Sequence, residues 1–317
     1  MDDLKNDDLF GSLDNKVDFL SDQTKKVNSD GIYRIDMQSV KDKNKGYRSV
    51  VRFLPNLKAD GTVGQSALEK ISHYVDIKNP KELSGYFDSP KNFSEKCALT
   101  DLYYQLDNSK NAILKERAKM LKYSKKYYSY VLILEDSQKP ELVGKIMVFS
   151  YGKTIRDKIL SEKNGEISGN SVNIFDMKAG KDFVLLVKEI QTGDETYPDY
   201  KMSMFKPETS SLPIYFKEKG TFKNVPLVDG QVDPKAQTMV REFLLDREHN
   251  LEDFAAKKLD DTQQAKISEI INYMTGKSSS NFPSKESKPS TSDFDIDQVM
   301  SGQTVENEDS DDFFDDL

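Results

Sequence analysis

The chain has 317 residues, 36% of them apolar and 32% charged, enough for about two typical domains or one large one. Its single cysteine, Cys97, excludes an internal disulfide and is typical of a reducing compartment. No apolar run approaches the roughly 20 residues that cross a bilayer, and the Met1-Asp-Asp-Leu4 start does not resemble a signal peptide, so we expect a soluble cytoplasmic protein.

Charge divides the chain into three parts. The whole chain carries −8, residues 293–317 carry −10 and residues 1–30 carry −4, so residues 31–292 carry +6. An acidic tail without Lys or Arg cannot bury enough apolar surface to fold alone. The pattern predicts a mildly basic body with two solvated arms.

Residues 1–30 are predicted to be a protein–protein arm. Their apolar residues are suited to a short amphipathic helix on a partner: Leu9, Phe10, Leu13, Val17, Phe19 and Leu20. From Gly31 apolar and polar residues alternate, which predicts strands over 32–37 and 47–54, the second stopped by Pro55.

The middle of the chain alternates between segments with helix- and strand-breaking residues and segments with regularly spaced apolar residues. We expect residues 57–100 to be loop-rich and residues 100–121 to form one helix. Strands are predicted over 127–134, 145–151 and 182–190, with a short helix over 154–160. Many short strands separated by turns favour a small barrel or sandwich.

The last third is predicted to be helical and then unstructured. Helices are expected over 234–250 and 251–274, followed by a Ser/Pro/Lys linker over 277–292 and the acidic tail over 293–317. The folded core is thus predicted to span 31–276.

Catalytic motifs are not apparent. Gly152-Lys-Thr154 lacks the upstream glycine of a phosphate loop, and neither His73 nor His249 lies in an acid/base motif. No nucleophile-elbow or cysteine-nucleophile motif occurs. We therefore predict that the protein is not an enzyme.

The most informative segment combines cations with aromatic rings. Residues 119–130 place Lys122, Lys125 and Lys126 beside Tyr127, Tyr128 and Tyr130. Cations suit the phosphate backbone of a single strand, and rings stack on unpaired bases at roughly 1–3 kcal/mol each. The alternative is that strands are rich in Tyr and the lysines form a solvated turn.

Similar combinations occur elsewhere. Arg48 and Arg52 are predicted on one strand face, with Tyr47 and Phe53 on the other. Phe149 and Tyr151 precede Lys153, and Tyr197, Tyr200 and Lys201 crowd one loop. Basic and aromatic residues on several strands and loops favour a single-strand binding groove.

Several segments resemble, in order and spacing, the single-stranded DNA-binding (helix-destabilising) proteins of T-even bacteriophages. They are Val50–Pro55, Tyr127–Asp136, Pro140–Lys145, Tyr151–Ile159, Asp182–Lys188 and the acidic terminus ending in Phe313, Phe314 and Leu317. Where the family has Arg before its aromatic-Gly-Lys segment, this chain has Ser150.

The resemblance implies an α+β fold with a five-stranded antiparallel OB-fold barrel. It also implies sequence-independent binding of single-stranded DNA in viral replication, recombination and repair, in the cytoplasm of an infected bacterium. The N-terminal arm would support cooperative binding along DNA. The tail would recruit replication and recombination proteins through Asp311, Asp312, Phe313, Phe314, Asp315, Asp316 and Leu317. Family-like DNA contacts map onto Arg52, Lys122, Tyr127, Tyr128, Phe149 and Lys153, with Phe93 and the loop of Tyr197 and Tyr200 added.

Zinc is where the chain departs from the family, whose pattern is one His and three Cys ending in Cys-x-x-Cys. Here His73 and Cys97 are kept, but Cys97-Ala-Leu-Thr100 lacks the second half. Structural zinc takes four N/S ligands. We therefore predict no zinc or other cofactor, with local packing of Tyr74, Tyr86, Phe87 and Phe93 instead.

One competing function belongs to a different class. The low pI of about 5.1 would also suit an acidic adaptor or DNA mimic that binds other proteins and not nucleic acid. The +6 charge of residues 31–292 argues against this interpretation.

Overall fold

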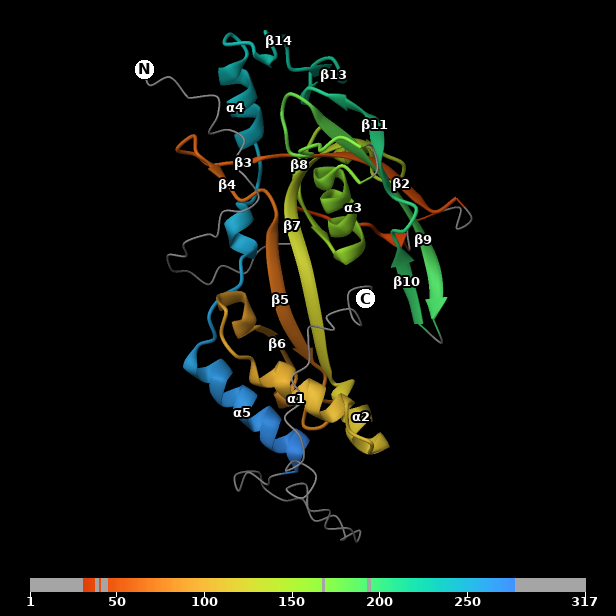
Figure 1. The fold of residues 1–317 in the computed structure, drawn as a ribbon, viewed down its shortest axis with the longest axis vertical. Helices are drawn as coiled ribbons and strands as arrows, with labels where there is room; N and C mark the ends of the chain where they lie inside the picture. The colour runs from red at the N-terminus through yellow and green to blue at the C-terminus, as the bar shows by residue number, and fades with distance from the viewer. Residues whose placement is uncertain (1–30, 38–39, 41–44, 167–168, 193–194, 277–317) are drawn as a thin grey trace. The chain divides into compact units, whose positions relative to one another are not determined.

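A computed structural model describes residues 31–37, 40, 45–166, 169–192 and 195–276 (Figure 1). The predicted arm, linker and acidic tail lie outside these residues. The described chain forms two compact units. Of the described residues, unit 1 contains those from 31 to 70 and 126–255, and unit 2 contains 71–125 and 256–276.

Unit 1 is built mainly from strands. Its elements are β1 (Ile32–Tyr33), β2 (Tyr47–Phe53), β3 (Asn56–Leu57), β4 (Val63–Gly64), a 3₁₀ turn at Pro140–Leu142, β8 (Ile146–Tyr151), α3 (Lys153–Asn164), β9 (Gly180–Thr192), β10 (Glu195–Asp199), β11 (Met204–Ser210), β12 (Pro213–Phe216), β13 (Thr221–Asn224), β14 (Leu227–Val228), β15 (Gln231–Val232), α4 (Gln237–Leu245) and a 3₁₀ turn at Leu251–Phe254.

Unit 2 is mainly helical. Its elements are 3₁₀ turns at Lys81–Leu83 and Pro90–Phe93, β6 (Gly85–Asp88), α1 (Ala98–Asp107), α2 (Ala112–Ala118) and α5 (Asp261–Thr275). Two long strands, β5 (Leu68–Val75) and β7 (Leu121–Asp136), run through the boundaries at residues 70 and 126.

The main sheet has nine strands and is mixed. Its central order is β1-β8-β7-β2-β9-β10; in addition β11 pairs with β9, and β5 pairs with β6 and β7. β1 runs parallel to β8, whereas the pairs β8/β7, β7/β2 and β2/β9 are antiparallel. The predicted α+β class is confirmed, and the five-stranded OB barrel remains a prediction.

The two faces of the unit 1 sheet are covered by separate apolar clusters. On β9, Phe183, Leu185 and Val187 are fully buried in one cluster, which helix α3 covers with Ile155 and Ile159 (Figure 1). The second cluster joins β7 and β8 to α4 through Leu132, Val148 and Leu244, among others. Burying each large apolar side chain contributes roughly 2–3 kcal/mol, so both faces of β7 hold the unit together.

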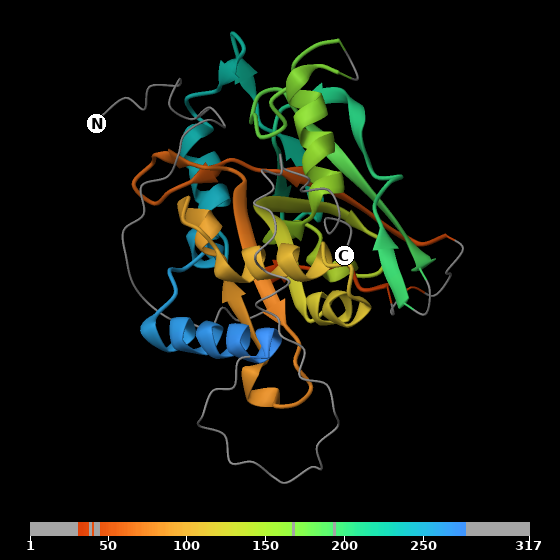
Figure 2. The ribbon, with the colours of Figure 1, turned by 60° about the horizontal axis from the view of Figure 1, so that its bottom comes forward.

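Unit 2 has its own core. Helices α1 and α5 lie side by side (Figure 2), and Leu102, Leu106 and Ile270 are buried with Val75 of β5. Helix α5 begins with a capping box between Asp260 and Gln263.

Three sequence predictions are wrong in detail. The single helix over 100–121 is two helices, because Asn111 accepts a hydrogen bond from the backbone N–H of Ile113 and starts α2. The strand β5 falls in the segment predicted as loops, since its buried polar Ser72 and His73 hide the apolar pattern. The helix over 251–274 is a 3₁₀ turn followed by α5.

No helix in the described part of the chain is long and apolar enough to cross a membrane.

Candidate nucleic-acid interface

Several of the predicted DNA contacts are buried core residues. Tyr127, Tyr130, Phe149 and Tyr151 are each between 1% and 7% exposed. The ring of Tyr127 stacks on that of Tyr151 at 5.8 Å, and the Tyr151 hydroxyl lies 2.9 Å from Ser129 Oγ. In this conformation the four rings pack the sheet and do not present open faces to bases.

Arg52 is also internal, contrary to its predicted place beside Arg48 on an accessible face. β2 keeps its alternation, since it pairs with β9 without a register shift, so Arg52 lies on the same face as Arg48 but at a covered position beside Asp182 and Ser210. The Arg52 side chain is fully buried and donates to Asp182 Oδ1 at 3.2 Å and to the carbonyl of Ser210 at 2.5 Å. Burial lowers the pKa of Arg52, and the charge of Asp182 opposes that shift.

Arg48 is accessible but already paired. Its Nη1 lies 2.6 Å from Glu135 Oε2, with about half of each side chain exposed. Because both side chains are half exposed, this is a solvated ion pair, which is worth little to stability.

One group of partly accessible cations of unit 1 lies on helix α3 and beside it. Lys153 and Arg156 occupy its first turn, directly after β8 and Gly152. The guanidinium carbon of Arg156 lies 5.9 Å from the ring centre of Tyr127 and so connects α3 to β7. Lys126 is exposed, but as the neighbour of Tyr127 in β7 it points to the opposite face of the strand. Arg156 also pairs with Asp157 at 2.8 Å.

The loop after β10 adds to this surface. Lys158 of α3 donates through Nζ to the carbonyl of Lys201 at 3.1 Å, and Lys201 is itself exposed. Tyr200 is half-buried against the core, and burial raises its pKa to about 12. We call Lys153, Arg156, Lys158 and Lys201 the α3 surface.

The hairpin of β9 and β10 continues the pattern. Tyr197 is half-buried and pairs in register with Ile190, while exposed Lys188 pairs with Asp199. Ile190 is 39% exposed, a large apolar side chain beside cations. The hairpin therefore offers both a cation and partly open apolar faces.

Tyr128 lies on the opposite face of β7 from Tyr127. Its ring stacks on Phe254 at 5.4 Å and is half-buried. Tyr130, on the same face, is held by hydrogen bonds to the backbone of His249 and Leu251 and by the guanidinium of Arg247, 4.0 Å from its ring centre. Burial raises the pKa of Tyr130 to about 12.

The remaining predicted residues belong to unit 2. Lys122 and Lys125 lie on the first part of β7, where Lys125 is half-buried. Phe93 is half-buried on a 3₁₀ turn, with Lys258 Nζ 5.4 Å from its ring centre. These three residues belong to unit 2, whereas the α3 surface belongs to unit 1.

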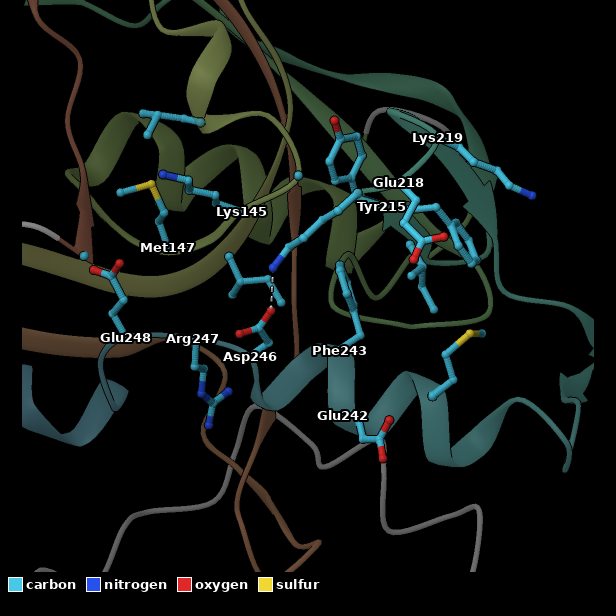
Figure 3. A pocket seen from close by; sticks show the side chains of 18 residues that line it. Lys145, Met147, Tyr215, Glu218, Lys219, Glu242, Phe243, Asp246, Arg247 and Glu248 are labelled. Carbon is cyan, nitrogen blue, oxygen red and sulfur yellow. Dashed lines mark hydrogen bonds and ion pairs between the residues drawn. The ribbon is translucent and has the colours of Figure 1, made fainter.

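A pocket of about 940 Å³ in unit 1 lies between the β8 turn, β12 and α4 (Figure 3). Its cations Lys145, Lys217, Lys219 and Arg247 are matched by four acids: Glu218, Glu242, Asp246 and Glu248. Lys217 pairs with Asp246 at 3.2 Å. The balanced charge makes this pocket a poor site for a polyanion.

Arg156 and Lys158 were missed by the sequence reasoning. The signal was present, since Arg156 and Lys158 lie within the helix predicted over 154–160, directly after Lys153. Helical spacing leaves Ile155 and Ile159 for the core and the cations for the surface.

A family model described as gp32 DNA binding protein like matches residues 45–275, which include all of the described residues of the α3 surface. Among curated proteins, none matches the chain.

Proposed function

Because the chain belongs to the family of gp32-like DNA-binding proteins, we propose that it is a non-enzymatic protein that binds single-stranded DNA with little sequence preference. The α3 surface is the observation that carries this proposal. Four exposed or half-buried cations lie together there, three on α3 and one in the loop after β10.

The surface suits a flexible polyanion. Lys and Arg neutralise phosphates and release counterions, which supplies affinity without reading sequence. Tyr197 and Tyr200 are half-buried, so each keeps part of its side chain accessible for stacking on an unpaired base. Because only single strands expose base faces, binding shifts duplex melting by mass action.

The finer roles extend this proposal. We infer that the protein acts in viral DNA replication, recombination and repair in the cytoplasm of an infected bacterium, on an OB-fold core. Residues 1–30 would contact a neighbouring copy on DNA, and Asp311–Leu317 would recruit replication proteins. Sequence composition supports these roles: ten acids in the last 25 residues, with Phe313, Phe314 and Leu317 as apolar anchors.

Fluorescence anisotropy of a labelled oligo-dT at several salt concentrations tests the proposal. The logarithm of the association constant should fall with the logarithm of salt by roughly 0.7 per phosphate neutralised. The Lys153→Ala/Arg156→Ala variant should weaken binding and reduce that slope by about 1.4. The Lys217→Ala/Lys219→Ala variant removes the same charge from the pocket of Figure 3 and should bind like the unchanged protein.

Equal weakening by both double variants would show a general charge effect, and no binding to oligo-dT at low salt would refute the proposal. Oligo-U in the same assay measures the preference for DNA. Incubating the labelled strand with the protein and Mg²⁺ tests for cleavage, and we expect it to stay intact.

A further inference from the structure

Four buried residues converge in unit 2. His73 on β5 pairs directly with Phe87 on β6, Cys97 precedes α1, and Thr100 lies in its first turn. All four are at most 3% exposed. His73 Nε2 lies 3.0 Å from Thr100 Oγ1 and 3.5 Å from Cys97 Sγ, so one ring nitrogen faces both side chains.

These residues do not fit zinc. A closed structural site takes four nitrogen or sulfur ligands, and the cluster offers His73 Nε2 and Cys97 Sγ alone. The Thr100 hydroxyl is a neutral oxygen, and Phe87 has no donor atom. Within residues that the structure describes, no group of three His, Cys, Asp or Glu is placed to hold a metal.

The second nitrogen of the His73 ring, Nδ1, also argues against a metal site. A histidine that binds a metal through one nitrogen normally donates from the other to a carboxylate, carbonyl or water. His73 Nδ1 is buried and has no hydrogen-bond partner in the described structure. The ring lacks the support that orients a metal ligand.

Packing takes the place of ligation. The Thr100 hydroxyl satisfies Nε2, the Tyr123 ring lies edge-on to His73 at 5.4 Å, and Phe87 belongs to the unit 2 core with Cys97. The predicted packing role is confirmed for Phe87 but wrong for Tyr74 and Tyr86, which are 46% and 52% exposed.

We infer that unit 2 keeps the positions of a four-ligand metal centre but fills two of them with Phe87 and Thr100, so that its fold is independent of metal. Directly opposed residues of an antiparallel pair have Cβ atoms roughly 4.5–5.5 Å apart on the same face. A thiolate at position 87 would therefore approach His73, and one at position 100 would replace the hydroxyl already beside Nε2. Phe87→Cys and Thr100→Cys together would create the missing half of the site.

Two measurements test this on the full-length protein. The unchanged chain, purified with zinc in the medium, should contain less than about 0.1 zinc per chain, and EDTA should leave its Tm unchanged. The Phe87→Cys/Thr100→Cys variant should bind about one zinc per chain, and EDTA should lower its Tm by about 5 °C or more. With Co²⁺ it should show the visible absorption of a tetrahedral thiolate site.

The matched control is Phe87→Ser/Thr100→Ser, which makes similar changes in size without adding thiolates and should bind neither metal. If the double cysteine variant does not fold, Thr100→Cys alone supplies a third ligand and should bind Co²⁺ more weakly. One tightly held zinc in the unchanged chain, with a Tm that EDTA lowers, would overturn the inference. So would a folded double cysteine variant that gives no Co²⁺ spectrum.

Discussion

Arg52 Nη1 and Asp182 Oδ1 lie 3.2 Å apart across the β2/β9 pair, with the arginine fully buried and the aspartate side chain 18% exposed. Asp182 also pairs with Lys206 at 3.1 Å. Gly180 leaves the room that the guanidinium needs, because a Cβ there would lie 2.6 Å from Arg52 Nη2. The arginine thus fixes the junction of β2, β9 and β11 from inside.

Arg52→Ala should therefore act on folding. It removes hydrogen bonds to Asp182 and Ser210 and leaves a cavity, which should lower the free energy of unfolding by about 3 kcal/mol. Arg48→Ala, in the exposed pair with Glu135, should cost at most about 1 kcal/mol. Urea denaturation followed by circular dichroism compares the two, and equal losses would contradict the burial argument.

Gly144→Ala should be more damaging than an ordinary loop substitution. Gly144 has φ +86°, and its Cβ would lie 2.1 Å from the ring of Tyr215, seen in Figure 3. Backbone strain and the ring displacement together should cost roughly 2–4 kcal/mol. Gly230→Ala is the control, since its φ is +74° but nothing lies within 4 Å, so the backbone cost of roughly 1 kcal/mol remains alone.

Thermal or urea unfolding of both glycine variants gives the difference. Adding Tyr215→Ala to Gly144→Ala should recover the steric part but not the backbone part. Similar losses for Gly144→Ala and Gly230→Ala would show that the Tyr215 ring moves at little cost.

His73 should make stability depend on pH. Burial, and to a lesser degree the charge of Lys91, lowers the pKa of His73 to about 4, below the ordinary 6.5. In the unfolded chain His73 therefore binds a proton below pH 6.5, whereas in the folded chain it binds one only below about pH 4. The contribution of neutral His73 to the free energy of unfolding is fully present above pH 6.5. It is lost as the pH falls, by about 2 kcal/mol between pH 7 and pH 5.

Urea denaturation at pH 7 and pH 5 measures this loss. The His73→Gln variant has no titrating group at position 73. It should be less stable than the unchanged protein, but its free energy of unfolding should change less between pH 7 and pH 5. The same loss in both proteins would assign the pH dependence to other groups.

Deleting residues 293–317 should tighten binding of oligo-dT at low salt. The deletion removes ten negative charges that compete with DNA at the effective concentration set by the tether. The gain should shrink as salt rises, because screening weakens the competition. A tail with Asn and Gln in place of its ten acids is the control and should behave like the deletion. Unchanged affinity at low salt would contradict the competition.

The long apolar runs were predictable from sequence. The strand over 182–190 appears within β9, and the helix over 154–160 within α3, because alternation and helical spacing reflect burial directly. The resemblance to T-even single-stranded DNA-binding proteins is confirmed at the level of the family.

The site was harder to predict, because polar or aromatic residue type does not reveal which face is covered. Strand β7 is buried on both faces, so Tyr127 and Tyr130 are packed although they lie on opposite sides. Arg52 shares a face of β2 with Arg48 as predicted, but its position beside Asp182 and Ser210 is covered. Both outcomes depend on tertiary packing and strand register, which local patterns do not encode.

The chain order of unit 2 has a consequence for synthesis. Its core needs α5, but residues 126–255 of unit 1 are translated between residues 71–125 and that helix. At a translation rate of roughly 5–20 residues per second, Ile270 emerges from the ribosome on the order of ten seconds after its core partners Leu102 and Leu106. Unit 1 is complete first, and the newly made half of unit 2 exposes its apolar face during that interval, when a chaperone or a protease has access to it.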